Sequence, residues 1–141
     1  MRTFGLSCLR SLLWLLILST GVGGTSWAQQ VPGPGNVSGR WVGPFRSDNF
    51  NCVITLDINQ SGTELTGFSY TDFRNDAGET MHGVASITGS LGTNRQVMIS
   101  EDALIDTVLI PGISIVLTDF RLELSANGTE LIGYFYTAKK P

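Results

Sequence analysis

The chain has 141 residues, seventeen of them glycine, with one histidine and a formal net charge of −3. This length allows a single domain with one core. The negative charge argues against nucleic acid as the main partner. A single histidine argues against histidine-rich metal sites. The high glycine content argues against a helical bundle, because glycine weakens helix interiors.

Residues 1–28 have the pattern of a secretory signal peptide. Arg2 and Arg10 give a positive start, an apolar run follows at 12–18, and the small residues Ser26 and Ala28 mark a cleavage site. The run is too short to span a bilayer as a stable helix, which needs about 20 residues. An uncleaved anchor is the alternative. We therefore expect a secreted or periplasmic protein, in which removing 28 of the 141 residues leaves 113.

After the signal peptide we expect a flexible N-terminal arm, 29–38, because Pro32, Gly33, Pro34 and Gly35 fall within it. A single domain, 39–141, follows. Its β-rich runs alternate with turn residues at a spacing typical of a sandwich or barrel. The predicted strands are 40–45, 51–59, 64–73, 81–91, 95–100, 104–110, 114–125 and 130–138. The sequence therefore predicts an all-β fold, a small antiparallel up-and-down β-barrel of about eight strands.

Two tight hairpins are expected, at 60–62 and at 126–128. Ser61-Gly62 and Asn127-Gly128 supply the positive φ values that such turns require. Residues 56–71 and 122–137, which contain these turns, align without a gap at an offset of 66. A gene duplication is one interpretation. We favour the other, in which two hairpins of one barrel meet the same steric demands.

Alternation along the strands predicts which side chains face the barrel interior. One buried face is formed by Cys52, Ile54, Leu56 and Ile58, and another by Leu65, Gly67, Ser69, Thr71 and Phe73. Phe135 occupies the matching position of the last strand. Polar and aromatic side chains facing inward near one mouth of the barrel could contact a ligand. The candidate ligand-binding residues are Trp41, Ser69, Thr71, Phe73 and Phe135.

The chain resembles known barrel families at its first strand. Gly39-Arg40-Trp41 looks like the Gly-x-Trp opening of avidin- and lipocalin-like (calycin-type) barrels, and 38–42 with 52–56 is similar to the small periplasmic inhibitors of secreted metalloproteases. The resemblance implies that Trp41 closes the barrel floor. A basic side chain would lie over it as a cation–π partner. The candidates for that partner are Arg121, Lys139 and Lys140.

The chain also departs from these families. Avidins line their pocket with several tryptophans, whereas Trp41 is the only one after residue 28, which argues against biotin as the ligand. In the protease inhibitors, the cysteine at the position of Cys52 forms a disulfide. Cys52 is the only cysteine after residue 28, so it has no partner within the mature chain. We expect a buried thiol there, with a reactive thiol or an intermolecular bridge as the alternatives.

No residue pattern points to catalysis or to a cofactor. The acids Glu101, Asp102 and Asp106 are expected on a solvated surface. Nothing in the sequence brings His82 to Cys52 as a nucleophile–base pair. The acidic loop at 72–79 lacks the alternating acids of an EF-hand, so no metal site is expected. Charged residues in the middle of strands argue against a membrane barrel.

We therefore expect an exported, non-enzymatic binding protein. Its partner would be a small apolar ligand or another protein. One alternative is an inhibitor of a secreted protease that acts through the N-terminal arm. Another is a structural component of the envelope or surface that uses exposed Tyr70, Tyr134 and Tyr136 as an interface.

Overall fold

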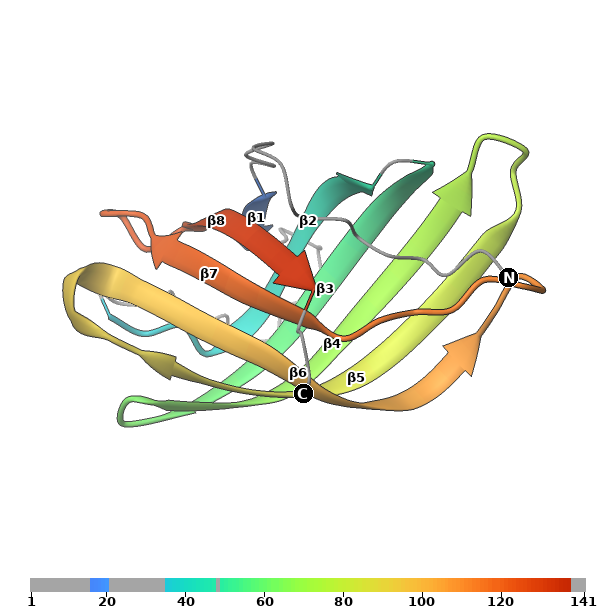
Figure 1. Ribbon diagram of the computed structural model, residues 1–141. Coiled ribbons are helices and arrows are strands. Elements are labelled where there is room, and N and C mark those ends of the chain that lie inside the picture. The colour runs from blue at the N-terminus through green and yellow to red at the C-terminus, as the bar shows by residue number, and fades with distance from the viewer. Residues whose placement is uncertain (1–15, 21–34, 48, 138–141) are drawn as a thin grey trace, which may run out of the picture.

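The computed structural model describes residues 16–20, 35–47 and 49–137, and the first of these segments as backbone only. Almost all of the regular structure is β-strand (Figure 1). The strands are β1 Leu16–Thr20, β2 Gly39–Ser47, β3 Phe50–Ser61, β4 Glu64–Asn75, β5 Thr80–Leu91, β6 Gln96–Val108, β7 Thr118–Leu124 and β8 Glu130–Thr137. A short 3-10 turn, η1 Thr93–Arg95, joins β5 to β6. The described part of the chain contains no helix with the length and hydropathy to cross a membrane.

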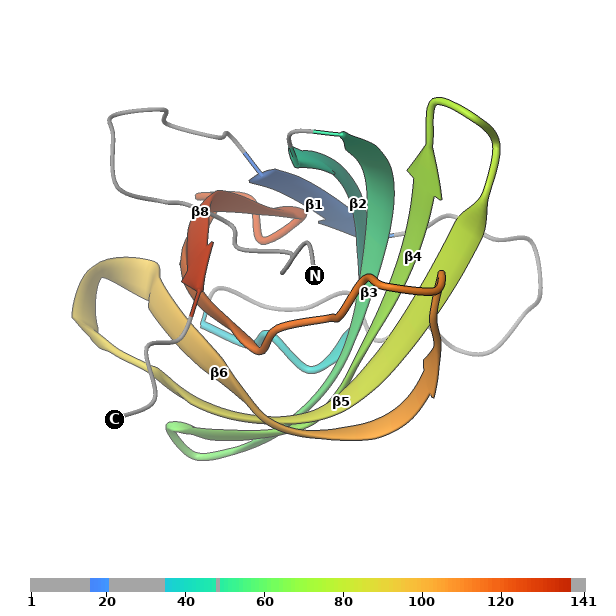
Figure 2. The same cartoon turned by 45° about the vertical axis from the view of Figure 1, so that its right-hand side comes forward.

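Each strand pairs antiparallel with the next in chain order, and β1 pairs with both β2 and β8 (Figure 2). The seven strands from Gly39 to Thr137 thus form an up-and-down barrel wall that β1 closes. This confirms the predicted all-β antiparallel barrel. Because β1 lies within the predicted signal peptide, cleavage after residue 28 would leave the wall open between β2 and β8.

The expected strand count within 39–141 was wrong by one. The predicted strands 95–100 and 104–110 are a single strand, β6, because β5 pairs along its whole length through two register shifts. The predicted strand 114–125 is shorter than expected, because only its second part, β7, pairs with β6. Residues 109–117 form a loop that crosses the open end of the barrel (Figure 2).

The barrel interior contains two groups of buried apolar side chains. The larger group surrounds Trp41, Leu56 and Leu122. The smaller one lies at the end that the loop crosses, and comprises Phe50, Cys52, Phe73, Met81 and Ile110. The predicted inward face of the second strand is confirmed, since Cys52, Ile54, Leu56 and Ile58 are all buried.

Both predicted hairpins are present, with Gly62 at φ 62° and Gly128 at φ 74°. In the two repeated sequences the corresponding residues Leu56 and Leu122 both face the interior, but the two hairpins pair their strands in different registers. Leu56 pairs with Ser69, whereas its counterpart Leu122 pairs with Gly133, two residues before the counterpart of Ser69. What the repeats share is close backbone contact: a Cβ atom on Gly67 would lie 1.8 Å from the Asp57 carbonyl oxygen, and one on Gly133 2.0 Å from that of Arg121.

The described end of the predicted arm is packed against the barrel. Val37 is fully buried, and its N–H donates a hydrogen bond to Oε1 of Gln60 at 2.7 Å. The Gln60 side chain also donates to the carbonyl oxygen of Gly35 at 3.1 Å. Residues 35–38 are therefore fixed to β3. Residues 29–34 lie outside the described part, so inhibition through this arm stays a prediction.

Candidate functional site

The most unusual interior residue is Glu101 on β6, which is only 7% exposed. Val97 and Ile99 point inward on the same strand, and the alternation carries Glu101 to the same side. The expectation of a solvated surface was therefore wrong for Glu101, although Asp102 and Asp106 are exposed as expected. A carboxyl group inside a barrel loses its hydration, so it needs other polar partners.

Two hydrogen-bond donors hold the Glu101 carboxylate. The Ser69 hydroxyl on β4 donates to Oε1 at 2.5 Å, and the backbone N–H of Thr118, where β7 begins, donates to Oε2 at 2.9 Å. Among the described residues, no basic side chain forms an ion pair with Glu101. Burial raises the pKa of Glu101 above its ordinary value of 4.5, and the hydrogen bonds from Ser69 and Thr118 counteract that rise.

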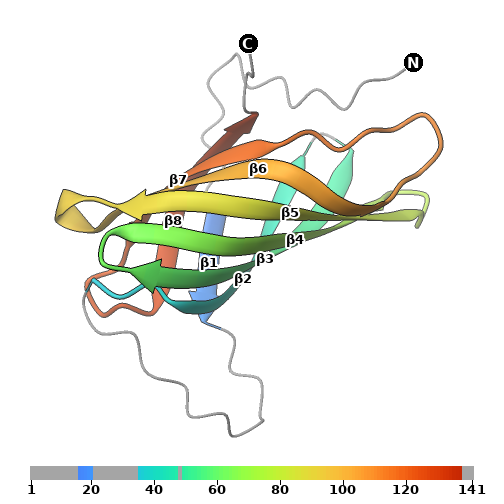
Figure 3. The ribbon, with the colours of Figure 1, turned by 90° about the horizontal axis from the view of Figure 1, so that it is seen from below.

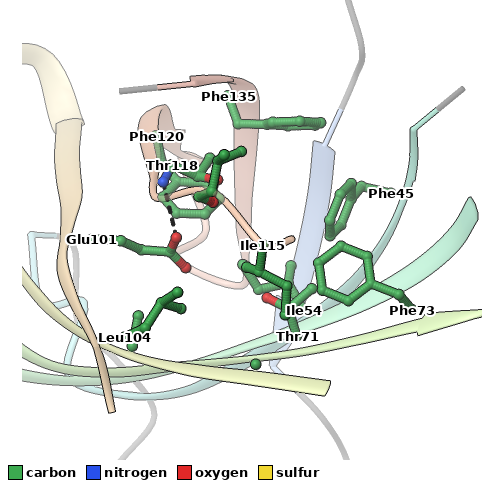
Figure 4. Close-up of a pocket in the computed structure, with 13 residues that line it drawn as sticks. Phe45, Ile54, Thr71, Phe73, Glu101, Leu104, Ile115, Thr118, Phe120 and Phe135 are labelled. Atoms are coloured by element: carbon green, nitrogen blue, oxygen red, sulfur yellow. Dashed lines mark hydrogen bonds between the residues drawn. The ribbon is translucent and has the colours of Figure 1, made fainter. Parts of the chain in front are cut away.

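Apolar and aromatic side chains surround this carboxylate. Phe45, Phe73, Phe120 and Phe135 line one interior cavity together with Glu101 (Figure 4). The rings of Phe45 and Phe135 meet edge to face with centroids 4.9 Å apart, and those of Phe45 and Phe73 with centroids 6.2 Å apart. The cavity volume is about 20 Å³. A water molecule needs roughly 10–15 Å³, so the cavity as it stands has room for about one.

The loop 109–117 limits the size of this cavity. Ile115 lines it, and Ile113 and Ile115 pack on the smaller apolar group at the barrel end. Ile115 also occupies space left by a glycine, since a Cβ atom on Gly83 would lie 2.8 Å from Ile115 Cδ1. The loop is therefore fitted to the barrel end by side chains, and displacing Ile115 would enlarge the cavity.

One part of the cavity wall, on β6, is partly exposed to solvent. Leu104 lines the cavity and pairs with Ala85, which is buried, yet Leu104 is 40% exposed. Leu104 is exposed because β7 pairs with β6 only from Gln96 to Ser100 and does not extend to Leu104. Among the described residues, no strand pairs with this edge of β6 beyond Ser100. Leu104 is thus a partly exposed part of the cavity wall.

The structure places three of the five predicted site residues on the same cavity, namely Thr71, Phe73 and Phe135. Ser69 reaches the cavity through its hydrogen bond to Glu101. Trp41 does not line it. The sequence analysis missed Glu101, and the signal that could have revealed it was the inward alternation of Val97 and Ile99.

Trp41 is fully buried in the larger apolar group, and its indole N–H donates to the Val37 carbonyl oxygen at 2.9 Å. Arg121 does not lie over it, because Arg121 is on the outer face and its Nε donates to the Tyr136 hydroxyl at 3.2 Å. The cation–π role proposed for Arg121 was therefore wrong. Lys139 and Lys140 lie outside the described residues.

Cys52 and His82 lie on opposite faces of the sheet. Cys52 is buried, and burial raises the pKa of its thiol to about 12, which makes the thiolate scarce and the thiol unreactive. The His82 Nδ1 atom lies 2.7 Å from an Asp72 carboxylate oxygen on the outer surface. Within the described segments, His, Cys, Asp and Glu side chains form no group of three or more that could hold a metal ion.

Comparisons with protein-family models, with curated proteins and with solved structures found no match to this chain. The fold, an antiparallel up-and-down barrel, is compatible with the calycin-type resemblance at the first strand.

Proposed function

We propose that this chain is an exported, non-enzymatic binding protein of calycin type, whose barrel interior takes one small ligand at Glu101. The ligand would have an apolar body and a group that donates hydrogen bonds, best of all an ammonium group. The observation that carries the proposal is the buried Glu101 carboxylate on a cavity lined mainly by aromatic and apolar side chains.

The carboxylate supports a ligand that carries a donor. Ser69 donates to one oxygen of Glu101 and the Thr118 N–H to the other, and because each carboxylate oxygen can accept two hydrogen bonds, the carboxylate can accept a further donor. An unpaired acid in an apolar interior reduces stability, and such groups gather at functional sites. A ligand ammonium group would supply the missing positive charge.

The surrounding side chains support an apolar body. Four phenylalanine rings and Ile54, Ile115 and Leu104 form most of the wall. Small-ligand sites typically combine such a lining with a few polar groups that set the orientation. Because the cavity is about 20 Å³, binding requires Ile115 and its loop to move away from the barrel end.

Three probes of similar size test this function: benzylamine, benzyl alcohol and benzoate. In a titration followed by ¹H–¹⁵N chemical shifts, benzylamine should bind more tightly than benzyl alcohol, and benzoate should not bind. The shifted amides should be those around Glu101, Thr118 and Phe135. Equal binding of benzylamine and benzoate, or shifts confined to the outer surface, would contradict the proposal.

Two variants sharpen the test. Glu101→Gln keeps the shape but removes the charge, so benzylamine affinity should fall at least about tenfold, which corresponds to about 1.4 kcal/mol. Asp106→Asn is the matched control, because Asp106 is an exposed acid on the same strand. It should leave the affinity unchanged.

A further inference from the structure

A groove lies on the outer side of the sheet, across β2, β3, β4 and β5, which run side by side in this order (Figure 3). Its volume is about 960 Å³, within the range of roughly 300–1,000 Å³ that small-ligand sites occupy. We call it the outer groove. Its lining includes Arg46, Asn51, Val53, Asp72, Arg74 and His82.

Two arginines lie in one row across the outer groove. Arg46 on β2 pairs with Asn51 on β3, and Asn51 pairs with Arg74 on β4. Because neighbouring strands are about 4.8 Å apart, the backbones of the two arginines are about 10 Å apart, with Asn51 between them. Both arginines are exposed, and among the described residues neither forms an ion pair. The row therefore presents two positive charges and an amide to one ligand.

The acid in the outer groove does not cancel these charges. Asp72 is held by His82, whose Nδ1 atom lies 2.7 Å from an Asp72 carboxylate oxygen. No other acid among the described residues lines the groove, since Asp76 and Glu79 of the hairpin between β4 and β5 lie outside it. The whole chain has a formal net charge of −3, so a groove with two arginines and one acid stands out. Charge complementarity indicates a negatively charged ligand.

An apolar surface adjoins the row of arginines. Val53 follows Asn51 by two residues on β3, so its side chain is on the same face, and it is 45% exposed. Val53 pairs with Pro44 on β2, which is also exposed. A ligand whose anionic group lies between Arg46 and Arg74 could therefore place an apolar group on Val53 and Pro44.

We propose that the outer groove binds a small phosphate monoester that carries an aryl or alkyl group. Such a phosphate has three acceptor oxygens and a charge of about −1.5 to −2 at pH 7. It can neutralise both Arg46 and Arg74, because each guanidinium binds oxyanions through two parallel N–H groups. A carboxylate would neutralise only one of them. This site goes beyond the proposed interior site and does not require that site to be occupied.

Three probes test the proposal in ¹H–¹⁵N titrations of the full chain at about pH 8, where a phosphate monoester is a dianion. Phenyl phosphate should shift the amides of Asn51, Val53 and Arg74 and leave those of Glu101 and Thr118 in place. Inorganic phosphate should shift the same amides but bind a few-fold more weakly, because it has no apolar group. Benzoate, with a single charge, should leave them unshifted.

Arginine variants test the contribution of the row. Arg74→Gln should weaken phenyl phosphate binding at least about tenfold, because it removes charged hydrogen bonds. Arg46→Gln should do the same from a second strand. Arg40→Gln is the matched control, because Arg40 lies on the same face of β2 as Arg46 but donates from Nε and Nη2 to Asp57, each at 2.7 Å. It should leave the affinity unchanged.

Two further variants test the charge and the apolar surface separately. Asp72→Asn should raise the affinity for phenyl phosphate, because it removes the negative charge of the groove itself. Val53→Thr keeps the shape but adds a hydroxyl group, so it should reduce the preference for phenyl phosphate over inorganic phosphate.

Three results would overturn the proposal: equal weakening by Arg40→Gln and Arg74→Gln, equal binding of benzoate and phenyl phosphate, or phenyl phosphate shifts that fall outside the outer groove. The first would mean that phosphate responds only to the net charge of the chain. Failure of benzylamine to bind would leave the outer groove unaffected, since its amides are not those around Glu101.

Discussion

At the scale of single residues, Glu101 links stability to the proposed function. Its carboxylate lies inside an apolar barrel, where Ser69 and Thr118 donate hydrogen bonds to it. Burial raises its pKa, so the folded state favours the protonated acid. The unfolded chain releases that proton near the ordinary value of 4.5. Glu101 therefore lowers stability at neutral pH compared with acidic pH.

This predicts how Glu101→Gln changes the pH dependence of stability. In the native protein, the stabilising contribution of the protonated Glu101 to the free energy of unfolding should be lost as the pH rises from about 4.5 through the raised pKa. Urea unfolding measures the free energy of unfolding of Glu101→Gln relative to that of the native protein. This difference should favour the variant more at about pH 8 than at about pH 5, by about 1.4 kcal/mol for each unit by which the pKa is raised. Asp106→Asn should not show this trend. The same change for both variants would contradict a buried, ionisable Glu101.

Much of the site was predictable from alternation alone. Strand alternation correctly predicted that Thr71, Phe73 and Phe135 face the interior, where they line the cavity. Glu101 was missed because it adjoins Asp102, and two successive acids are usually solvated. Its partner Ser69 lies 32 residues away in the chain, on a strand that does not pair with β6. Such a contact depends on the order and register of three adjacent strands, β4, β5 and β6, which local pattern does not report.

At the scale of elements, the loop 109–117 differs most from expectation. The predicted strands 104–110 and 114–125 took in most of it, including Ile110, Ile115 and Val116. Instead, the Pro111-Gly112 turn directs the chain across the barrel end, where Ile113 and Ile115 pack on buried side chains. Burial of apolar surface thus outweighs strand pairing here. Among the described strands, residues 103–108 of β6 pair only with β5.

Ile115→Ala should open the interior site. Removing the side chain from a half-buried position should cost about 1–2 kcal/mol of unfolding free energy, because Ile→Ala changes in full cores cost about 2–5 kcal/mol. It should also increase the affinity for benzylamine, because the ligand no longer has to displace that side chain. Denaturation and chemical-shift titration measure the two effects. Ile105→Ala, on the outer edge, is the matched control for affinity. Weaker benzylamine binding by Ile115→Ala would contradict the role given to the loop.

At the scale of the whole molecule, the sequence correctly predicted an up-and-down antiparallel barrel but placed all its strands after residue 38. The eighth strand, β1, instead falls in the predicted signal peptide. Its pairing is short, with two residue pairs to β2 and four to β8. The apolar run that predicts a signal peptide is also typical of a β-strand, so composition alone did not distinguish a signal peptide from a strand.

A chain that begins at residue 29 tests the contribution of β1. The seven remaining strands contain both groups of buried side chains described above, so we expect this shorter chain to fold. Hydrogen exchange should show lost protection at β2 and β8 residues that pair with β1, with Trp41 and Leu131 as reporters. Protection in β4 and β5 should stay unchanged. Unchanged protection at Leu131 would mean that β2 and β8 close on each other directly.

The central claim is that the barrel interior binds a small ligand through Glu101. A crystal structure of the full chain soaked with benzylamine tests it most directly. The account predicts the ammonium nitrogen within hydrogen-bond distance of the Glu101 carboxylate, the ring among Phe45, Phe120 and Phe135, and Ile115 displaced from its place against Gly83. Benzylamine bound only on the outer surface, with Ile115 still in place, would contradict it.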